Sequence, residues 1–343
     1  MIKNIRIKQI YTNSLSCEPM LERTQNGELL CVCQCDGPSE PHPDNRVYAF
    51  HSKDNGETWS EKEKIYPEDG NAVYCTELSV EGDEITAYLT IHNGRFLNWK
   101  CVMMKSFDNG YTWKNYGAPP HFPENTFIRT QIHTSKGDIV IPYQHYPVKQ
   151  EDVERVLKDE TITDKGIWQA GAAYCESGVL VSSKHANSYD RYAASKMNTS
   201  SSWIWSEPTV VELSDGTLAM LMRKCKSGWL WYTESKDGGK TWSETIKTDI
   251  PNPSNKPKLL KIEDKIALIH TPNGCDKRGW GKRYPLSIWI SNDDMKTWKY
   301  KTNLTEFPGS YSYTDGFYED GHIMFTIEHN RHTILFFDLE LED

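Results

Sequence analysis

The sequence of 343 residues lacks features that would assign it to several large functional classes. It has no cluster of basic residues, and its 48 Asp and Glu outnumber its 39 Lys and Arg, which argues against nucleic acid as a partner. No apolar run approaches the roughly 20 residues of a membrane span. No cofactor-binding motif is present. We therefore expect no cofactor, no nucleic-acid partner and no membrane partner.

Signals for secretion and for metal binding are also missing. The N-terminal residues 1–8 lack the apolar region and cleavage site of a signal peptide. The nine cysteines are an odd number, and Cys31, Cys33 and Cys35 alternate along a strand pattern, which places all three on one face instead of in mutual disulfides. Because CxxC spacing is absent, we expect no metal site and a reduced, cytoplasmic protein.

Helical periodicity is nearly absent, whereas turn-forming and aromatic residues are abundant. The chain has 22 Gly, 17 Pro, 12 Trp and 18 Tyr. The one helix-like stretch, residues 150–158, falls inside an irregular segment, residues 147–170. We interpret this segment as an insertion that covers one face of an otherwise all-β domain.

One octapeptide pattern, Ser-x-Asp-x-Gly-x-Thr-Trp, recurs along the chain. Its four copies are Ser52–Trp59, Ser106–Trp113, Ser235–Trp242 and Ser291–Trp298, the last without the Gly. Each copy follows a strand-like run and precedes another. Asp and Thr side chains can bond nearby backbone amides, and Trp can anchor the turn in the core. The pattern therefore predicts four hairpin turns of one repeated unit.

The spacing of the copies predicts the number of units. The motif aspartates are separated by 54, 129 and 56 residues, so one unit has about 55 residues and the long gap, about residues 127–200, holds a unit without the motif. Six strand–turn–strand patterns follow the same period. We predict a single domain over 1–343, an all-β six-bladed β-propeller in which residues 3–11 add the outer strand of the last blade and close the ring.

This octapeptide is the Asp-box, and with it the chain resembles the sialidase (neuraminidase) superfamily of β-propellers. The segment from Trp205 to Arg223 is similar to the sialidase blade in which a Glu opens the inner strand and an Arg ends the returning strand. The resemblance implies that Glu207 is the base for a nucleophilic tyrosine and that Arg223 binds the carboxylate of the sugar. It also implies Arg283 as a further carboxylate ligand and Tyr311 as the nucleophile, with Tyr313 as the alternative.

The chain departs from the family at two places. The first blade of the family opens with Arg-Ile-Pro, but this chain has Cys17-Glu18-Pro19 there, so one of three carboxylate-binding arginines is missing. The family's acid/base aspartate precedes the first Asp-box, where this chain has residues 40–46. His42 and Asp44 are the candidates for this role, together with Glu40, and the spacing does not choose among them.

The starts of the inner strands of a propeller converge at one mouth of its channel, so residues from distant positions can form one site. Besides the residues above, we expect four more to contribute to substrate binding there: Arg129, His133, Tyr143 and Arg331. This set is rich in arginine, whose planar guanidinium matches a carboxylate. The pattern favours an acidic ligand.

Three functions are compatible with these patterns. The first is an exo-acting glycoside hydrolase that removes a terminal acidic sugar of the sialic acid type from a small oligosaccharide. The second is an enzyme that cleaves rhamnose–glucuronate linkages by hydrolysis or β-elimination, as related Asp-box propellers do. The third is a carbohydrate-binding propeller without catalysis, because fold does not imply activity. The sequence makes no prediction of oligomeric state.

Overall fold

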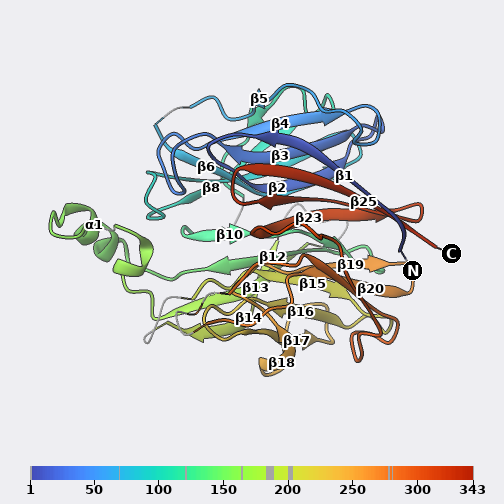
Figure 1. Ribbon diagram of the computed structural model, residues 1–343. Helices are drawn as coiled ribbons and strands as arrows, with labels where there is room; N and C mark the ends of the chain where they lie inside the picture. Colours follow the sequence, from blue (N-terminus) through green and yellow to red (C-terminus); the bar gives the residue numbers. More distant parts are fainter. Residues whose placement is uncertain are drawn as a thin grey trace.

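The computed structural model consists of six β-sheets arranged as the blades of a propeller, so the predicted fold is confirmed (Figure 1). It describes residues 2–68, 70–119, 122–163, 165–182, 189–199, 204–276, 279 and 281–342. Inner strands of neighbouring blades contact each other around the ring, including the strands of the last and first blades. The predicted irregularity of blade three is also present, as a fifth short strand.

The strands of each blade run from the channel outward. Blade one contains β2 (Ser16–Arg23), β3 (Leu29–Cys35), β4 (Arg46–Ser52) and β5 (Glu63–Lys64), and blade two contains β6 (Ala72–Glu81), β7 (Glu84–His92), β8 (Lys100–Ser106) and β9 (Lys114–Asn115). Blade three contains β10 (Thr126–Ile128), β11 (Ile132–His133), β12 (Ile139–His145), β13 (Tyr174–Ser182) and β14 (Asp190–Asn198). Blade four contains β15 (Pro208–Glu212), β16 (Leu218–Met222), β17 (Trp229–Ser235) and β18 (Ile246–Pro251).

Blade five contains β19 (Lys258–Ile262), β20 (Lys265–His270), β21 (Ser287–Ser291) and β22 (Tyr300–Asn303). Blade six contains β23 (Tyr311–Glu319), β24 (His322–His329) and β25 (Thr333–Leu341), with β1 (Ile2–Thr12) as its outer strand. Strand β1 pairs antiparallel with β25, so the two ends of the chain meet in one sheet. Their joint position is visible at the right of Figure 1.

Each Asp-box forms the turn that the octapeptide pattern predicts, between the third and fourth strands of its blade. In the first copy, Asp54 accepts hydrogen bonds from the backbone N–H of Thr58 at 2.9 Å and from its hydroxyl at 2.5 Å. Ser52 Oγ in turn accepts the N–H of Gly56 at 2.7 Å. The same carboxylate-to-threonine bonds recur in the other three copies. The box is therefore a local structural unit on the outer side of the blade.

The hydrophobic core lies between neighbouring blades. Each of the six junctions has its own apolar cluster, and every box tryptophan packs against the cluster between its blade and the preceding one. These clusters hold the blades as a closed ring, which leaves the inner strand starts fixed around the channel.

The segment 147–170 forms an arm beside the ring. It contains helix α1 (Gln150–Lys158) and a 3₁₀ helix, η1 (Ile167–Gln169), and projects from blade three at the left of Figure 1. Val153 and Val156 of α1 are buried in a cluster that also contains Trp99, Phe127 and, at its edge, Trp205. The arm therefore rests on aromatic residues at one mouth of the channel. Among the described residues, no helix is long and apolar enough to cross a membrane.

Candidate active site

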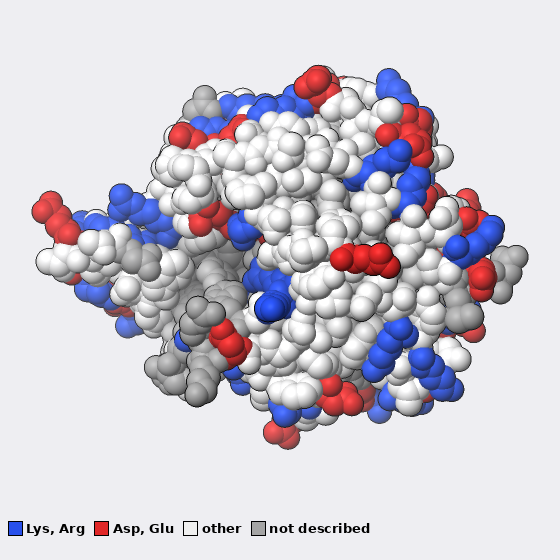
Figure 2. Space-filling view, viewed as in Figure 1, with Lys and Arg blue, Asp and Glu red and all other residues white. Residues whose placement is uncertain are grey.

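A cavity of about 190 Å³ lies at the mouth beside the arm. Four arginines, three glutamates, one tyrosine and three aromatic apolar residues line it: Arg129, Arg223, Arg283, Arg331, Glu18, Glu40, Glu207, Tyr313, Phe96, Phe127 and Trp205. They come from all six blades, from positions up to 313 residues apart. On the face shown in Figure 2, the surface is hollowed between the arm and the ring, and basic side chains lie at this hollow.

Glu207 and Arg223 form a buried, doubly hydrogen-bonded pair in the cavity. Glu207 directly precedes β15 and Arg223 directly follows β16, so the antiparallel pairing of the two strands places them side by side. Arg223 Nη1 lies 2.9 and 2.8 Å from the two carboxylate oxygens of Glu207. Although burial opposes ionisation, Arg223 and Arg129 lower the pKa of Glu207, which keeps it a carboxylate.

Arg129 links two carboxyl groups at the wall of the cavity. Its Nη2 lies 3.9 Å from Glu207 Oε1 and its Nη1 lies 3.9 Å from Glu18 Oε2. Gln144 Oε1 accepts from Arg129 Nη2 at 3.3 Å and from Nε at 3.4 Å, which fixes the plane of the guanidinium. Burial raises the pKa of Glu18, although Arg129 and Arg331 oppose this effect. The cavity therefore contains both a charged carboxylate and a carboxyl group that is harder to ionise.

Arg283 reaches the cavity from the loop before β21. Its Nη1 donates to Ser312 Oγ at 2.5 Å and its Nη2 donates to the backbone oxygen of Ser254 at 2.9 Å. Burial, followed by the positive charge of Arg223, lowers the pKa of Arg283, so the two guanidinium groups are close enough to repel each other. Such a pair of cations favours an anion between them.

Arg331 is the fourth arginine and comes from the turn between β24 and β25. It forms an ion pair with Glu40, and its Nη1 lies 3.9 Å from Glu328 Oε1. The arginine side chain is 34% exposed, whereas those of Glu40 and Glu328 are 9% and 1% exposed. Arg331 therefore stands at the entrance, beside the loop that holds Glu40.

Tyr313 lines the cavity because β23 contains a bulge. The pairing of β23 with β24 shifts between Ser312 and Asp315, and Tyr313 has a φ of 55°, in the left-handed region. Burial, and then the carboxylates of Glu207 and Glu18, raise the pKa of Tyr313. The result is a neutral phenol near the carboxylate of Glu207. Glu18 is also on a bulge, in β2, with a φ of 47°.

The nucleophile prediction moves from Tyr311 to Tyr313. Tyr311 is fully buried and does not line the cavity. Its hydroxyl donates to the backbone oxygen of Phe307 at 2.9 Å, and its ring lies 4.9 Å from that of His329. Tyr311 is thus a packed residue beneath the turn, since the bulge directs only Tyr313 toward the channel.

The acid/base candidates in the loop before the first Asp-box are also separated by the structure. His42 Nδ1 lies 3.4 Å from Asp44 Oδ2, the Asp44 side chain is 68% exposed, and neither residue lines the cavity. Asn45 Nδ2 donates to the backbone oxygens of Asp36 and Ser39 at 2.8 and 3.0 Å and shapes the loop. This shape directs Glu40 to the cavity instead.

Two predicted binding residues lie away from the cavity. His133 belongs to β11, farther along the channel, and its Nε2 lies 2.8 Å from Glu81 Oε1. Tyr143 is buried inside blade three, where its hydroxyl donates to Glu176 Oε1 at 2.7 Å and accepts from Arg191 Nε at 3.0 Å. Both belong to strands of blade three, whose irregular pairing the repeat pattern did not resolve.

Sequence reasoning left several lining residues out of the predicted site. Phe96 and Trp205 follow no motif, and they reach the cavity because the arm cluster packs beside it. Glu18 could be located from the sequence, because the segment Cys17-Glu18-Pro19 stands where the family has its first arginine. Its negative charge, however, argued against a role in binding an anion. Burial of the carboxyl, which raises its pKa, reduces that conflict.

Comparison with known proteins identifies the family of the chain. Residues 27–324 match the family model described as a BNR repeat-like domain. No curated protein shows significant similarity to the chain.

Solved structures give the same fold at low identity. The Hadza microbial sialidase Hz136 has a TM-score of 0.70 at 16% identity, over 95% of this chain and 66% of that one. A Dyadobacter fermentans protein of unknown function has a TM-score of 0.73 at 16% identity, over 99% and 100%. Trypanosoma rangeli sialidase with the inhibitor DANA has a TM-score of 0.67 at 14% identity, over 96% of this chain but only 55% of that one. The chain therefore belongs to the family of BNR repeat-like domains, with the six-bladed fold of the sialidase superfamily.

Proposed function

We propose that the protein is an exo-acting glycoside hydrolase that removes a terminal acidic sugar of the sialic acid type. The observation that carries this proposal is the convergence of four arginines, Tyr313 and Glu207 in one cavity. Its volume of about 190 Å³ suits a single sugar residue at the end of a chain. A site of this size favours removal of terminal units over internal cleavage.

Three arginines can hold the carboxylate of the sugar. Arg223 and Arg283 repel each other within the cavity, and Arg331 stands at its entrance, so an anion among them would relieve the repulsion. Arg331, from blade six, takes the place of the arginine that the first blade lacks. Glu40 pairs with Arg331 in the absence of substrate.

The chemistry follows from the pairing of a phenol with a carboxylate. Tyr313 Oη attacks the anomeric carbon while Glu207 accepts the phenol proton, and the bond from that carbon to the leaving oxygen breaks. The sugar carboxylate displaces Glu40 from its ion pair with Arg331, so that Glu40 takes up a proton from solvent and then donates it to the leaving oxygen. In the second step Glu40 accepts a proton from water, the water oxygen bonds to the anomeric carbon, and Tyr313 leaves with the proton that Glu207 returns.

A neutral nucleophile suits an acidic sugar. A carboxylate at the position of Tyr313 would repel the sugar carboxylate held by the arginines, whereas a phenol does not until its proton leaves. Structures of Trypanosoma rangeli sialidase are described as complexes with sialic acid and with 2,3-difluorosialic acid as a covalent intermediate. These descriptions support a sialic acid type of substrate for this chain as well.

A terminal uronic acid is the second candidate substrate. Glu18 replaces the first-blade arginine and Arg129 adds a cation beside it, so the charges differ from those of the family pattern. The elimination variant would use Tyr313 as its base, because Tyr313 lines the cavity and the described lining contains no histidine.

The test is release of product from a panel of fluorogenic sialosides and glucuronides by the wild type and by Glu207→Gln. Glu61→Gln, an exposed glutamate near the first Asp-box, is the matched control. We expect turnover of one acidic class, retained in the control and lowered by about 10³-fold or more in Glu207→Gln. Turnover that survives Glu207→Gln would contradict the mechanism. Binding without turnover would identify the protein as a carbohydrate-binding propeller.

A further inference from the structure

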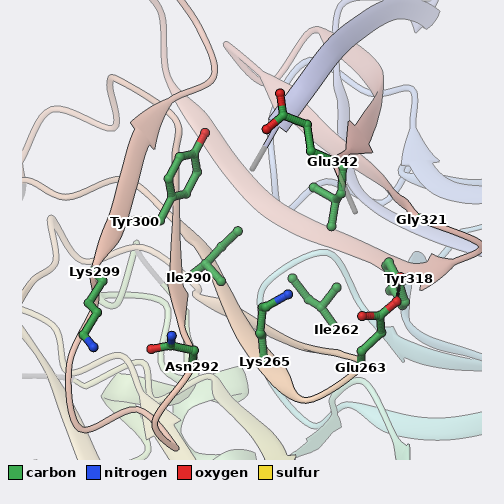
Figure 3. A pocket seen from close by; sticks show the side chains of 11 residues that line it. Ile262, Glu263, Lys265, Ile290, Asn292, Lys299, Tyr300, Tyr318, Gly321 and Glu342 are labelled. Atoms are coloured by element: carbon green, nitrogen blue, oxygen red, sulfur yellow. Dashed lines mark hydrogen bonds between the residues drawn. The ribbon is translucent and has the colours of Figure 1, made fainter.

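A second pocket lies between blades five and six, at the end of the strands opposite to the candidate active site. Its volume is about 260 Å³. Ile262, Ile290 and Leu341 provide aliphatic surface, and the rings of Tyr300 and Tyr318 lie at its two sides (Figure 3). A separate set of polar residues forms the rim: Glu263, Lys265, Asn292, Lys299 and Glu342.

At four other junctions, an Asp-box occupies the corresponding position. The box packs over the preceding blade, and in three of the four boxes its central glycine leaves no room for a side chain. A Cβ on Gly56 of blade one would lie 2.2 Å from Phe336 of blade six, and one on Gly110 of blade two would lie 2.8 Å from Leu30 of blade one. Gly239 of blade four approaches Val179 of blade three in the same way, at 3.0 Å.

The box of blade five shows how polar groups complete the contact. Its Met295 and Trp298 pack against the apolar cluster between blades four and five. Its Asp294 accepts hydrogen bonds from the backbone N–H of Ser214 at 3.0 Å and from the Ser214 hydroxyl at 2.5 Å. Lys261 lowers the pKa of Asp294 further, after these hydrogen bonds. An apolar tip and an acidic neighbour therefore seat the turn on the preceding blade.

Blade six has no box that could cover blade five in this way. A box joins the third and fourth strands of a blade, but in blade six these are β25 and β1, which lie at opposite ends of the chain. Blade three also lacks an Asp-box, but its junction with blade two is covered in another way. There, Tyr189 and Phe122 pack against the apolar cluster between the two blades. Over blade five, the part of the chain that the structure describes leaves the pocket open.

We propose that this pocket is a docking site for a polypeptide turn of a partner protein, which takes the position of the missing sixth box. An apolar side chain at the tip of the turn would contact Ile262, Ile290 and Leu341. An aspartate or asparagine beside it would meet Lys265 and Lys299 at the rim, in the place corresponding to that where Asp294 of blade five accepts hydrogen bonds from Ser214 of blade four. Recognition of an apolar anchor within a polar rim is typical of protein interfaces.

The experiment uses the complete chain labelled with ¹³C in the isoleucine δ1 methyl groups. The probe is a cyclic peptide with the protein's own box sequence, residues 291–298. Ile262 and Ile290 report on the pocket, and Ile128 and Ile141 of blade three report on the rest of the ring. We expect saturable shifts of the first two signals without shifts of the other two.

The variant that tests the contact is Lys265→Glu combined with Lys299→Glu, because both lysines are at the rim and not in the core. Lys236→Glu combined with Lys240→Glu, in the exposed box of blade four, is the charge-matched control. We expect at least tenfold weaker binding of the peptide in the first variant and unchanged binding in the control. Absence of shifts at millimolar peptide, or equal affinity in both variants, would overturn the proposal. Shifts of the same methyl groups by glucose in place of the peptide would also overturn it.

Discussion

At the scale of single residues, the position of the proposed nucleophile, Tyr313, depends on one backbone irregularity. Tyr311 and Tyr313 are two residues apart, so a regular strand would place them on the same face. The bulge at Tyr313 turns its side chain into the cavity and leaves Tyr311 packed against Phe307. The difference in position between the two tyrosines of one strand, and with it their proposed difference in function, thus follows from a shift in pairing.

This assignment predicts opposite results for two matched variants. Tyr313→Phe removes the attacking oxygen, and we expect turnover to fall by about 10³-fold or more. Tyr311→Phe removes one hydrogen bond, to the backbone of Phe307, and we expect a loss of stability of about 1 kcal/mol with turnover retained. Turnover numbers and urea unfolding curves of both variants check the prediction. The reverse pattern would restore Tyr311 as the nucleophile.

Buried carboxyl groups predict how stability depends on pH. Burial raises the pKa of Glu328 to about 8. The carboxyl therefore keeps its proton in the folded state at a pH where the unfolded chain has lost it, and its contribution to stability is lost as pH rises from about 4.5 to about 8. Burial lowers the pKa of Lys256 from 10.5 to about 8. Its contribution to stability therefore increases as pH rises above about 8, outside the range in which Glu328 acts.

We expect the melting temperature to fall between pH 5 and pH 8, and to fall less in Glu328→Gln, which has no proton to lose. Thermal unfolding at a series of pH values measures both slopes. Equal slopes for the two proteins would show that Glu328 is already ionised in the folded state. The exposed Asp320→Asn, in the turn between β23 and β24, is a suitable control for general effects of substitution in blade six.

Sequence patterns predict some site residues better than others, for physical reasons. Glu207 and Arg223 flank a regular hairpin, so their convergence follows from strand pairing alone. Glu18 and Tyr313 depend on bulges, which break the two-residue period without a clear sequence signature. Glu40 depends on a loop that Asn45 shapes through hydrogen bonds, and loop geometry has no periodicity to detect.

At the scale of elements, the Asp-box is both a turn and a contact between blades. Its hydrogen bonds are local in sequence, from Ser52 to Thr58 in the first copy, so the octapeptide pattern predicts the turn directly. Its packing on the preceding blade is not local, since Gly56 contacts Phe336 at the other end of the chain. The pattern therefore predicts the repeat and its fold, but not the partner of each box.

Two glycines with the same backbone conformation separate these two roles. Gly56 and Gly27 both have a φ of 87°, but only Gly56 faces Phe336, because no atom lies within 4 Å of a Cβ on Gly27. We expect Gly27→Ala to cost about 1 kcal/mol through backbone strain, and Gly56→Ala about 1–3 kcal/mol more through steric overlap. Urea unfolding of both variants measures the difference. Equal losses would mean that the box does not press on blade six.

At the scale of the whole molecule, ring closure is the property that keeps the site together. The lining residues come from six blades, and their relative positions depend on every junction between blades. Blade six is built from both ends of the chain, through β1 and β25. The repeat count predicts this arrangement, because the last unit is one strand too short.

Removal of residues 2–12 tests the role of closure. We expect the shortened protein to unfold at a much lower temperature, since β25 would become an exposed edge and the apolar cluster between blades five and six would lose Ile2 and Ile7. Calorimetry measures the change. A control variant, Lys8→Ala, removes only an exposed ion pair with Glu57 and should leave the melting temperature nearly unchanged. Unchanged stability of the deletion would show that three strands suffice for blade six.

The central claim is that Tyr313 attacks an acidic sugar held by the arginines. The most direct measurement is intact-protein mass spectrometry after incubation with a 2,3-difluorinated acidic sugar, followed by peptide mapping. We predict one covalent adduct on Tyr313 in the wild type and none in Tyr313→Phe. An adduct on another residue, or turnover of an acidic sugar without any adduct on Tyr313, would contradict this account.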